Sequence, residues 1–103
     1  MKVKLIVIGK TKSKFLIEGE NEYQKRLKHY CKFSELVISD IKNSGKLSKK
    51  ELKEKEGNLI LESIKNNDYV ISLDDKGLAL TSVDFAEFLN KKMVSSTNEL
   101  VFV

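Results

Sequence analysis

Short apolar runs alternate along the chain with longer segments in which apolar residues recur at helical spacing. Short runs of this kind are typical of strands, whereas recurrence every three or four residues is typical of amphipathic helices. The expected strands cover residues 2–9, 33–39, 69–73 and 99–103, and the expected helices cover 14–30, 48–65 and 81–92. This β-α-β-α-β-α-β order predicts a single α/β domain over residues 1–103, with a mostly parallel sheet and right-handed crossovers.

Each expected helix has one apolar side that should pack on the sheet. These sides comprise Phe15, Leu16, Tyr23, Leu27 and Tyr30 in the first helix, Leu52, Leu59, Ile60 and Ile64 in the second, and Phe85, Phe88, Leu89 and Met93 in the third. Ser48 and Glu51 have the spacing of a capping box, in which each side chain satisfies a backbone N–H of the other residue. Glu56 lies on the apolar side of the second helix, either as half of a structural ion pair or as a site residue.

The run at residues 69–73 suits a strand covered on both faces, as in a parallel sheet. It breaks abruptly into the sequence Asp74-Asp75-Lys76-Gly77, which is typical of a turn. Ligands of open α/β sheets bind just beyond the carboxyl ends of such strands. Leu73 stands at that end, where its main chain can offer a C=O or N–H group to a ligand.

The charge of the chain is uneven. Residues 1–65 hold 16 Lys and Arg against 9 Asp and Glu, whereas residues 66–103 hold 3 against 6, giving a net charge of +4 overall. The basic part is compatible with a phosphate-rich partner such as RNA, and equally with a surface that only confers solubility. Candidate phosphate contacts are Lys10, Lys12, Lys14, Lys25, Arg26, Lys28 and Lys32. The nearby aromatics Tyr23 and Tyr30 are expected to pack in the core rather than to stack on bases.

Few residues support chemistry of their own. Cys31 and His29 are two positions apart and point in different directions on a helix, so a neutral cysteine and a surface histidine are favoured over a nucleophile and base. Asp74 and Asp75 could pair as acid and base or bind a metal, but without companion ligands a solvated turn is favoured. No dinucleotide, Walker A or zinc-protease motif occurs. The residues therefore indicate no catalytic group and no metal.

The location expected from the sequence is the cytoplasm. The single cysteine of the chain excludes an internal disulfide framework. No apolar run approaches the roughly 20 residues that a membrane helix needs. The first residues read as a strand rather than a signal peptide. The residues taken alone thus predict a cytoplasmic α/β domain with a ligand site at the carboxyl ends of its strands.

Four stretches together carry a family resemblance. They are Met1-Lys-Val-Lys-Leu-Ile-Val-Ile-Gly-Lys10, Glu22-Tyr-Gln-Lys-Arg-Leu27, Lys53-Glu-Lys-Glu-Gly57, and Val70-Ile-Ser-Leu-Asp74 through Lys76-Gly77. In order and spacing the chain resembles the N-terminal two-thirds of the ribosomal RNA large subunit methyltransferase H family, within the SPOUT (α/β-knot) superfamily. The resemblance implies a homodimeric enzyme without metal that transfers a methyl group from S-adenosylmethionine to N3 of a pseudouridine in 23S ribosomal RNA. Leu73 matches a family position that contacts the cofactor.

The chain differs from the family that it resembles in one segment. Members continue beyond the Leu-Val-Phe-Val strand into an Ile-Gly-Gly loop and a knotted C-terminal segment, which holds most of the cofactor and completes the dimer. No counterpart of that segment occurs within residues 1–103, so the sequence resembles a truncated member whose methyl transfer is not expected from these residues alone. The alternative is a basic RNA-binding α/β module without catalysis, and a clipped sheet with an exposed edge around residues 100–103 should in addition self-associate.

Overall fold

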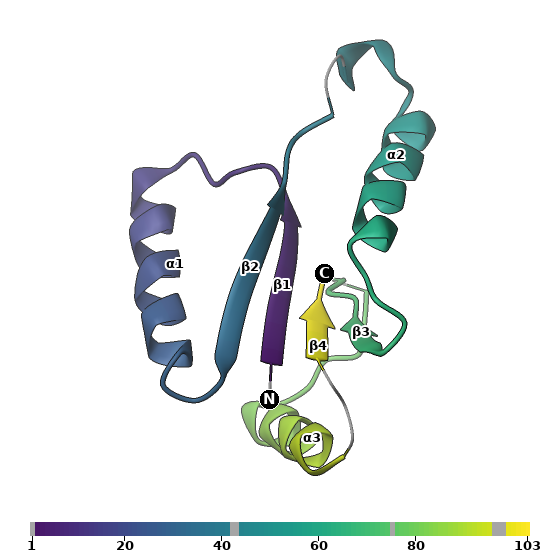
Figure 1. The fold of residues 1–103 in the computed structure, drawn as a ribbon. Helices are drawn as coiled ribbons and strands as arrows, with labels where there is room; N and C mark the ends of the chain where they lie inside the picture. The colour runs from purple at the N-terminus through teal and green to yellow at the C-terminus, as the bar shows by residue number, and fades with distance from the viewer. Residues whose placement is uncertain (1, 42–43, 75, 96–98) are drawn as a thin grey trace.

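The computed structural model describes residues 2–41, 44–74, 76–95 and 99–103, and it contains strands and helices in strict alternation (Figure 1). The strands are β1 (Lys2–Ile8), β2 (Lys32–Ile38), β3 (Asp68–Ile71) and β4 (Glu99–Phe102); the helices are α1 (Lys14–Leu27), α2 (Lys49–Glu62) and α3 (Ser82–Val94), with a 3-10 turn at Ser44–Lys46. The predicted β-α-β-α-β-α-β order is therefore confirmed, with element ends that shift by up to three residues.

All four strands are parallel and lie in the order β2-β1-β4-β3. The chain thus builds outward from β1 to β2, and then crosses to the other side of β1 for β3 and β4. Parallel strands cannot be joined by tight turns, which is why a helix intervenes at each connection. This arrangement confirms the predicted α/β class with a parallel sheet.

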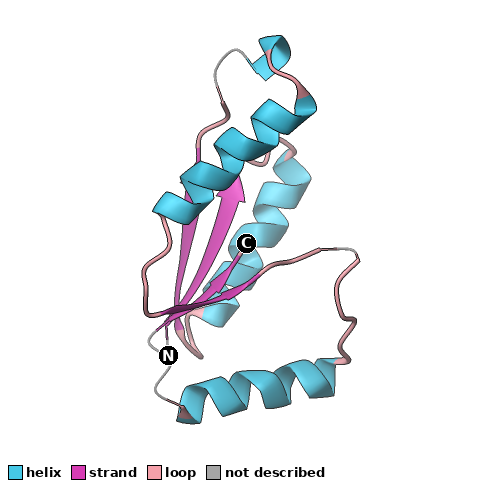
Figure 2. Ribbon diagram, turned by 90° about the vertical axis from the view of Figure 1, so that its right-hand side faces the viewer, coloured by secondary structure: helices cyan, strands magenta, loops and turns pink. Residues whose placement is uncertain are grey.

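The two sides of the sheet carry different helices, with α2 on one side and α1 on the other (Figure 2). The α3 helix lies on the same side as α1, because Phe85 packs against Phe102 with ring centroids 6.1 Å apart. Phe102 shares that side with Leu5, its register partner in β1. We call this side the α1 face and the opposite side the α2 face.

The most deeply buried side chains belong to the two central strands. Leu100 and Val101 of β4 are fully buried, and Ile6 of β1 is 2% exposed. β4 lies between β1 and β3, so neighbouring strands flank both of its edges. The core of the domain is therefore centred on the last strand of the chain.

Two expectations about burial were wrong, because an apolar run does not show whether a strand lies at the centre or at the edge of the sheet. The run at residues 69–73 forms an edge strand, in which Tyr69 and Val70 are 41% and 42% exposed, rather than a strand covered on both faces. Conversely, residues 99–102 do not form an exposed edge, since they pair on both sides. The exposed edges of the sheet belong to β2 and β3.

The predicted apolar side of α1 faces the sheet across a groove, and it stays open to solvent. Phe15, Tyr23 and Tyr30 are 81%, 65% and 82% exposed, so the expected core packing of these aromatics was wrong. Tyr30 also lies outside α1, which ends at Leu27. The packing of α3 is closer, because the Lys92 ammonium sits 3.7 Å from the centre of the Tyr69 ring, which itself packs near Phe88.

The starts of α2 and α3 have side-chain caps that match the sequence signals. The Glu51 N–H donates to Ser48 Oγ over 3.1 Å, and the Asp84 N–H donates to Thr81 Oγ1 over the same distance. The capping box is only half formed, because the Glu51 carboxylate accepts from the Ser48 hydroxyl rather than from a backbone N–H. Each cap satisfies one of the orphan donors at the start of its helix.

Replacing Ser48 with alanine should lower the free energy of unfolding by about 1 kcal/mol, since the Glu51 N–H loses its acceptor. Ser13 provides a matched control, because it caps α1 without a side-chain hydrogen bond. Urea denaturation of both variants measures the difference. Equal losses for Ser48→Ala and Ser13→Ala would show that the observed cap bond does not stabilise α2.

Candidate functional site

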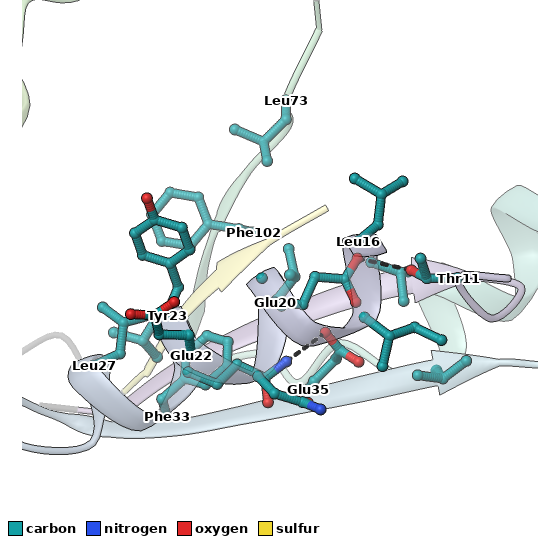
Figure 3. Close-up of a pocket in the computed structure, with 18 of the residues that line it drawn as sticks. Thr11, Leu16, Glu20, Glu22, Tyr23, Leu27, Phe33, Glu35, Leu73 and Phe102 are labelled. Atoms are coloured by element: carbon teal, nitrogen blue, oxygen red, sulfur yellow. Dashed lines mark hydrogen bonds between the residues drawn. The ribbon is translucent and has the colours of Figure 1, made fainter. Parts of the chain in front are cut away.

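A wide groove runs along the α1 face between α1 and α3, with the sheet as its floor (Figure 3). Its volume is about 1620 Å³. The floor is apolar because strand alternation places Val3, Leu5 and Phe33 on this face. Its other apolar lining residues include Leu16, Tyr23, Leu27, Leu73, Phe85, Leu89, Met93 and Phe102. The groove is large enough for a nucleoside-sized ligand.

Leu73 lies at the β3 side of this groove, apart from the side chains of α1 (Figure 3). Its backbone N–H donates to the carbonyl of Val103 over 2.8 Å, which continues the pairing of β3 with β4 past Ile71. The Leu73 side chain is not packed in the core, since it is 62% exposed. The structure therefore places this residue at a strand end, with its side chain available to a ligand in the groove.

The turn after Leu73 is fixed by bonds to Asp74. The Asp74 carboxylate accepts the N–H of Lys76 over 2.9 Å, and its carbonyl accepts the N–H of Gly77 over 3.0 Å. These bonds agree with the turn predicted from the sequence. Asp75, the other half of the predicted acidic pair, lies outside the described residues. The hydrogen bond from Leu73 to Val103 holds the residue that precedes this turn against the end of β4.

Carboxylates supply most of the charge around the groove. Glu35 projects from β2 onto the otherwise apolar floor, where its Oε2 atom accepts from Gln24 Nε2 of α1 over 3.1 Å. At the carboxyl end of β1, Thr11 Oγ1 donates to Glu20 Oε1 over 2.7 Å. Glu18 and Glu22 also line the groove, although Glu22 forms an ion pair with Arg26 over 2.7 Å, and the lining residues include a single lysine, Lys10. The groove therefore suits a ligand that combines apolar surface with positive charge.

Sequence reasoning did not single out Glu35, although a signal was present. Phe33, Glu35 and Val37 occupy alternate positions of β2 and so share one face. A carboxylate between two apolar residues interrupts that pattern at the middle of the strand. The pairing of Thr11 with Glu20 had no comparable signal, because the two residues come from a loop and a helix.

At the end of β1, the loop that contains Gly9 lies close to the loop that contains Asp40, and the two loops form the rim of the groove. Gly9 has a φ of +79°, and its N–H donates to the Ile38 carbonyl over 2.8 Å. A Cβ atom at Gly9 would lie 2.8 Å from Asp40 Oδ1. Gly9 therefore allows a tight exit from β1, and it also leaves room for the Asp40 carboxylate.

Other candidate residues remain dispersed. The Cys31 thiol is half-buried and contacts the Leu27 carbonyl at 3.6 Å. Glu56 is half-buried on α2, and its carboxylate has no hydrogen bond or ion pair within the part of the chain that the structure describes. Among the described residues, no group of three or more His, Cys, Asp or Glu side chains is placed to hold a metal ion.

The sequence is similar to proteins whose family is known. The family described as predicted SPOUT methyltransferase matches this chain over residues 1–103. The chain belongs to the SPOUT methyltransferase family. The resemblance drawn from the sequence motifs is thereby confirmed, and proteins of this family use S-adenosylmethionine as methyl donor.

Individual relatives carry a more specific name. The chain is 50% identical over 103 residues to ribosomal RNA large subunit methyltransferase H of Parabacteroides distasonis and 48% identical to that of Flavobacterium johnsoniae. In both cases the match covers all of this chain and 66% of the relative. Against the Clostridium tetani protein of the same name, identity is 43% and the share of the relative is 67%. The chain thus spans about two-thirds of the length of these SPOUT methyltransferases.

None of the helices within the described residues is long and apolar enough to cross a membrane. In the part of the chain that the structure describes, four parallel strands alternate with three helices, which is consistent with the N-terminal part of a SPOUT methyltransferase.

Proposed function

We propose that this chain is part of a methyltransferase that transfers a methyl group from S-adenosylmethionine to N3 of a pseudouridine in 23S ribosomal RNA. The observation that carries the proposal is the position of Leu73, which lies at the carboxyl end of β3 and lines the large groove. Identities of 41–50% to proteins named ribosomal RNA large subunit methyltransferase H support the substrate class. By the same similarity, the protein acts in the cytoplasm as a homodimer.

The groove fits the chemistry of this cofactor. S-adenosylmethionine joins an apolar, planar adenine to a sulfonium cation, and when bound it supplies an electrophilic methyl group. Aromatic side chains such as Phe102 and Tyr23 offer surface for a planar ring. The carboxylates of Glu20 and Glu35 give the groove a negative potential that favours a cation. In this proposal Leu73 contacts the cofactor, and no described residue is assigned the role of catalytic base.

Calorimetric titration of the protein with S-adenosylmethionine tests the proposal directly. Binding heat with a dissociation constant of about 1 mM or tighter is expected. The absence of heat up to that concentration would overturn cofactor binding by these residues. A parallel assay of labelled methyl transfer to 23S ribosomal RNA, with uridine in place of pseudouridine as control, tests the reaction in the same preparation.

Replacing Leu73 with alanine should weaken cofactor binding by roughly 5- to 30-fold, because about 1–2 kcal/mol of apolar contact is lost. Leu61 provides a matched control, since it is similarly exposed at 66% but lies on α2 outside the groove. Leu61→Ala should bind the cofactor as the unchanged protein does. Identical affinities for Leu73→Ala and the unchanged protein would place the cofactor elsewhere.

A second candidate function, RNA binding without catalysis, is favoured by the surplus of basic residues in residues 1–65. In that case the protein would bind 23S ribosomal RNA with a strong dependence on salt and would give no heat with S-adenosylmethionine. The two titrations together therefore distinguish an enzyme from a binding module.

A further inference from the structure

A row of lysines crosses the α2 face at the starts of β1 and β2. Parallel pairing places Lys2 directly opposite Lys32, and Lys4 lies one pleat further along β1 on the same face. We define these three residues as the lysine row. Lys2 and Lys32 are exposed and Lys4 is half-buried. Lys32 is a candidate phosphate contact from the sequence, but its pairing with Lys2 was not evident there, because the two residues are 30 positions apart and meet only through the register of the strands.

The lysine row is unfavourable for the folded chain by itself. Like charges directly opposite each other on neighbouring strands repel, and the strands are only about 4.8 Å apart. None of the three ammonium groups has a hydrogen bond or ion pair with any described residue. Further along the same face the corresponding positions are apolar, as Ile6 and Leu36 show. A repulsive pair at the start of an otherwise apolar face is a local violation of the kind expected at functional sites.

Two carboxylates at this level of the sheet offset part of the charge of the row. Glu99 of β4 is the register partner of Lys2 on its other side, and Asp68 of β3 is the partner of Glu99. Glu99 is only 9% exposed, and the Asp68 carboxylate is occupied in part by the N–H of Lys65. The charge presented to solvent above β1 and β2 is therefore positive.

We propose that the lysine row is a docking surface for the phosphate backbone of the RNA substrate, remote from the methyl-transfer site. Lysine acts on phosphates as a point charge and needs no particular base, which suits a contact that positions the RNA. The row lies roughly 20 Å from the carboxyl ends of the strands, as six residues of β1 separate them. A folded RNA is long enough to contact both the lysine row and the carboxyl ends of the strands. This inference rests on the proposed function, from which it takes RNA as the partner.

The test compares binding of a 23S ribosomal RNA transcript to the unchanged protein and to the double variant Lys2→Gln/Lys32→Gln. Loss of two phosphate contacts should reduce the slope of log affinity against log salt by about 1.5 and weaken binding tens of fold near 0.1 M salt. Lys53→Gln/Lys91→Gln removes the same charge from two exposed helical positions and should change both values much less.

Three further results bear on the inference. The urea midpoint of the Lys2→Gln/Lys32→Gln variant should stay close to that of the unchanged protein, because the variant removes both the repulsion between Lys2 and Lys32 and the attraction between Lys2 and Glu99. Weaker binding would then not reflect unfolding. An unchanged salt slope, or equal losses in both double variants, would overturn the row as a docking surface. Failure of the unchanged protein to bind the transcript would overturn it as well, whereas the proposed cofactor site is judged separately by the titration with S-adenosylmethionine.

Discussion

Leu100→Ala is expected to destabilise the protein by about 2–5 kcal/mol. Leu100 is fully buried on the α1 face of β4, between Val3 and Tyr69 on the neighbouring strands. Truncation leaves a cavity that the flanking strands cannot close, because their register is fixed on both sides. Since domains of this size are stable by only about 5–15 kcal/mol, such a loss is a large part of the total.

Urea denaturation followed by circular dichroism measures this effect. Leu78→Ala is the matched control, because Leu78 is 87% exposed and the same truncation there should change stability by no more than about 0.5 kcal/mol. A loss below about 1 kcal/mol for Leu100→Ala would contradict the central position of β4 in the core.

The contrast between β3 and β4 shows what the sequence can and cannot predict about this fold. Both strands are short apolar runs, and the run at residues 69–73 is as apolar as the run at residues 99–103. Periodicity therefore identifies two strands. Whether a strand lies at the centre or the edge depends on which neighbours the crossovers bring to it, and here the order β2-β1-β4-β3 puts the last strand inside. That order is a property of the whole chain and not of either run.

The α1 helix illustrates a related limit. Helical spacing correctly predicts that Phe15, Leu16 and Tyr23 share one side of the helix. It does not predict how closely that side approaches the sheet, and Phe15 is 81% exposed in the structure. A pattern of apolar residues reports which side of a helix avoids water, whereas burial also requires a second surface within contact distance.

The candidate site was predictable only in part. Leu73 follows from a local signal, the boundary between an apolar run and a turn, combined with the rule that ligands bind at strand ends. The carboxylates that give the groove its charge are brought together by tertiary structure. Glu35 reaches Gln24 across the gap between β2 and α1, and no spacing in the sequence relates it to Leu73 on the opposite edge of the sheet.

Gly9→Ala is also expected to be costly, with a loss of about 1–3 kcal/mol in the free energy of unfolding. Two independent penalties contribute. A side chain disfavours the positive φ of 79°, which the hydrogen bond from Gly9 N–H to the Ile38 carbonyl helps to hold. In addition, the new Cβ atom would lie 2.8 Å from Asp40 Oδ1, so the Asp40 carboxylate must move aside.

A double-mutant cycle with Asp40→Ala separates the two penalties. Removing the Asp40 carboxylate relieves the steric contact but leaves the backbone conformation strained. The double variant should therefore recover about 1 kcal/mol of the loss caused by Gly9→Ala, and retain the remainder. If Asp40→Ala restores nothing, the contact is accommodated without cost and the penalty lies wholly in the backbone. If the double variant is as stable as Asp40→Ala alone, the positive φ imposes no strain and the close approach of the two loops accounts for the glycine.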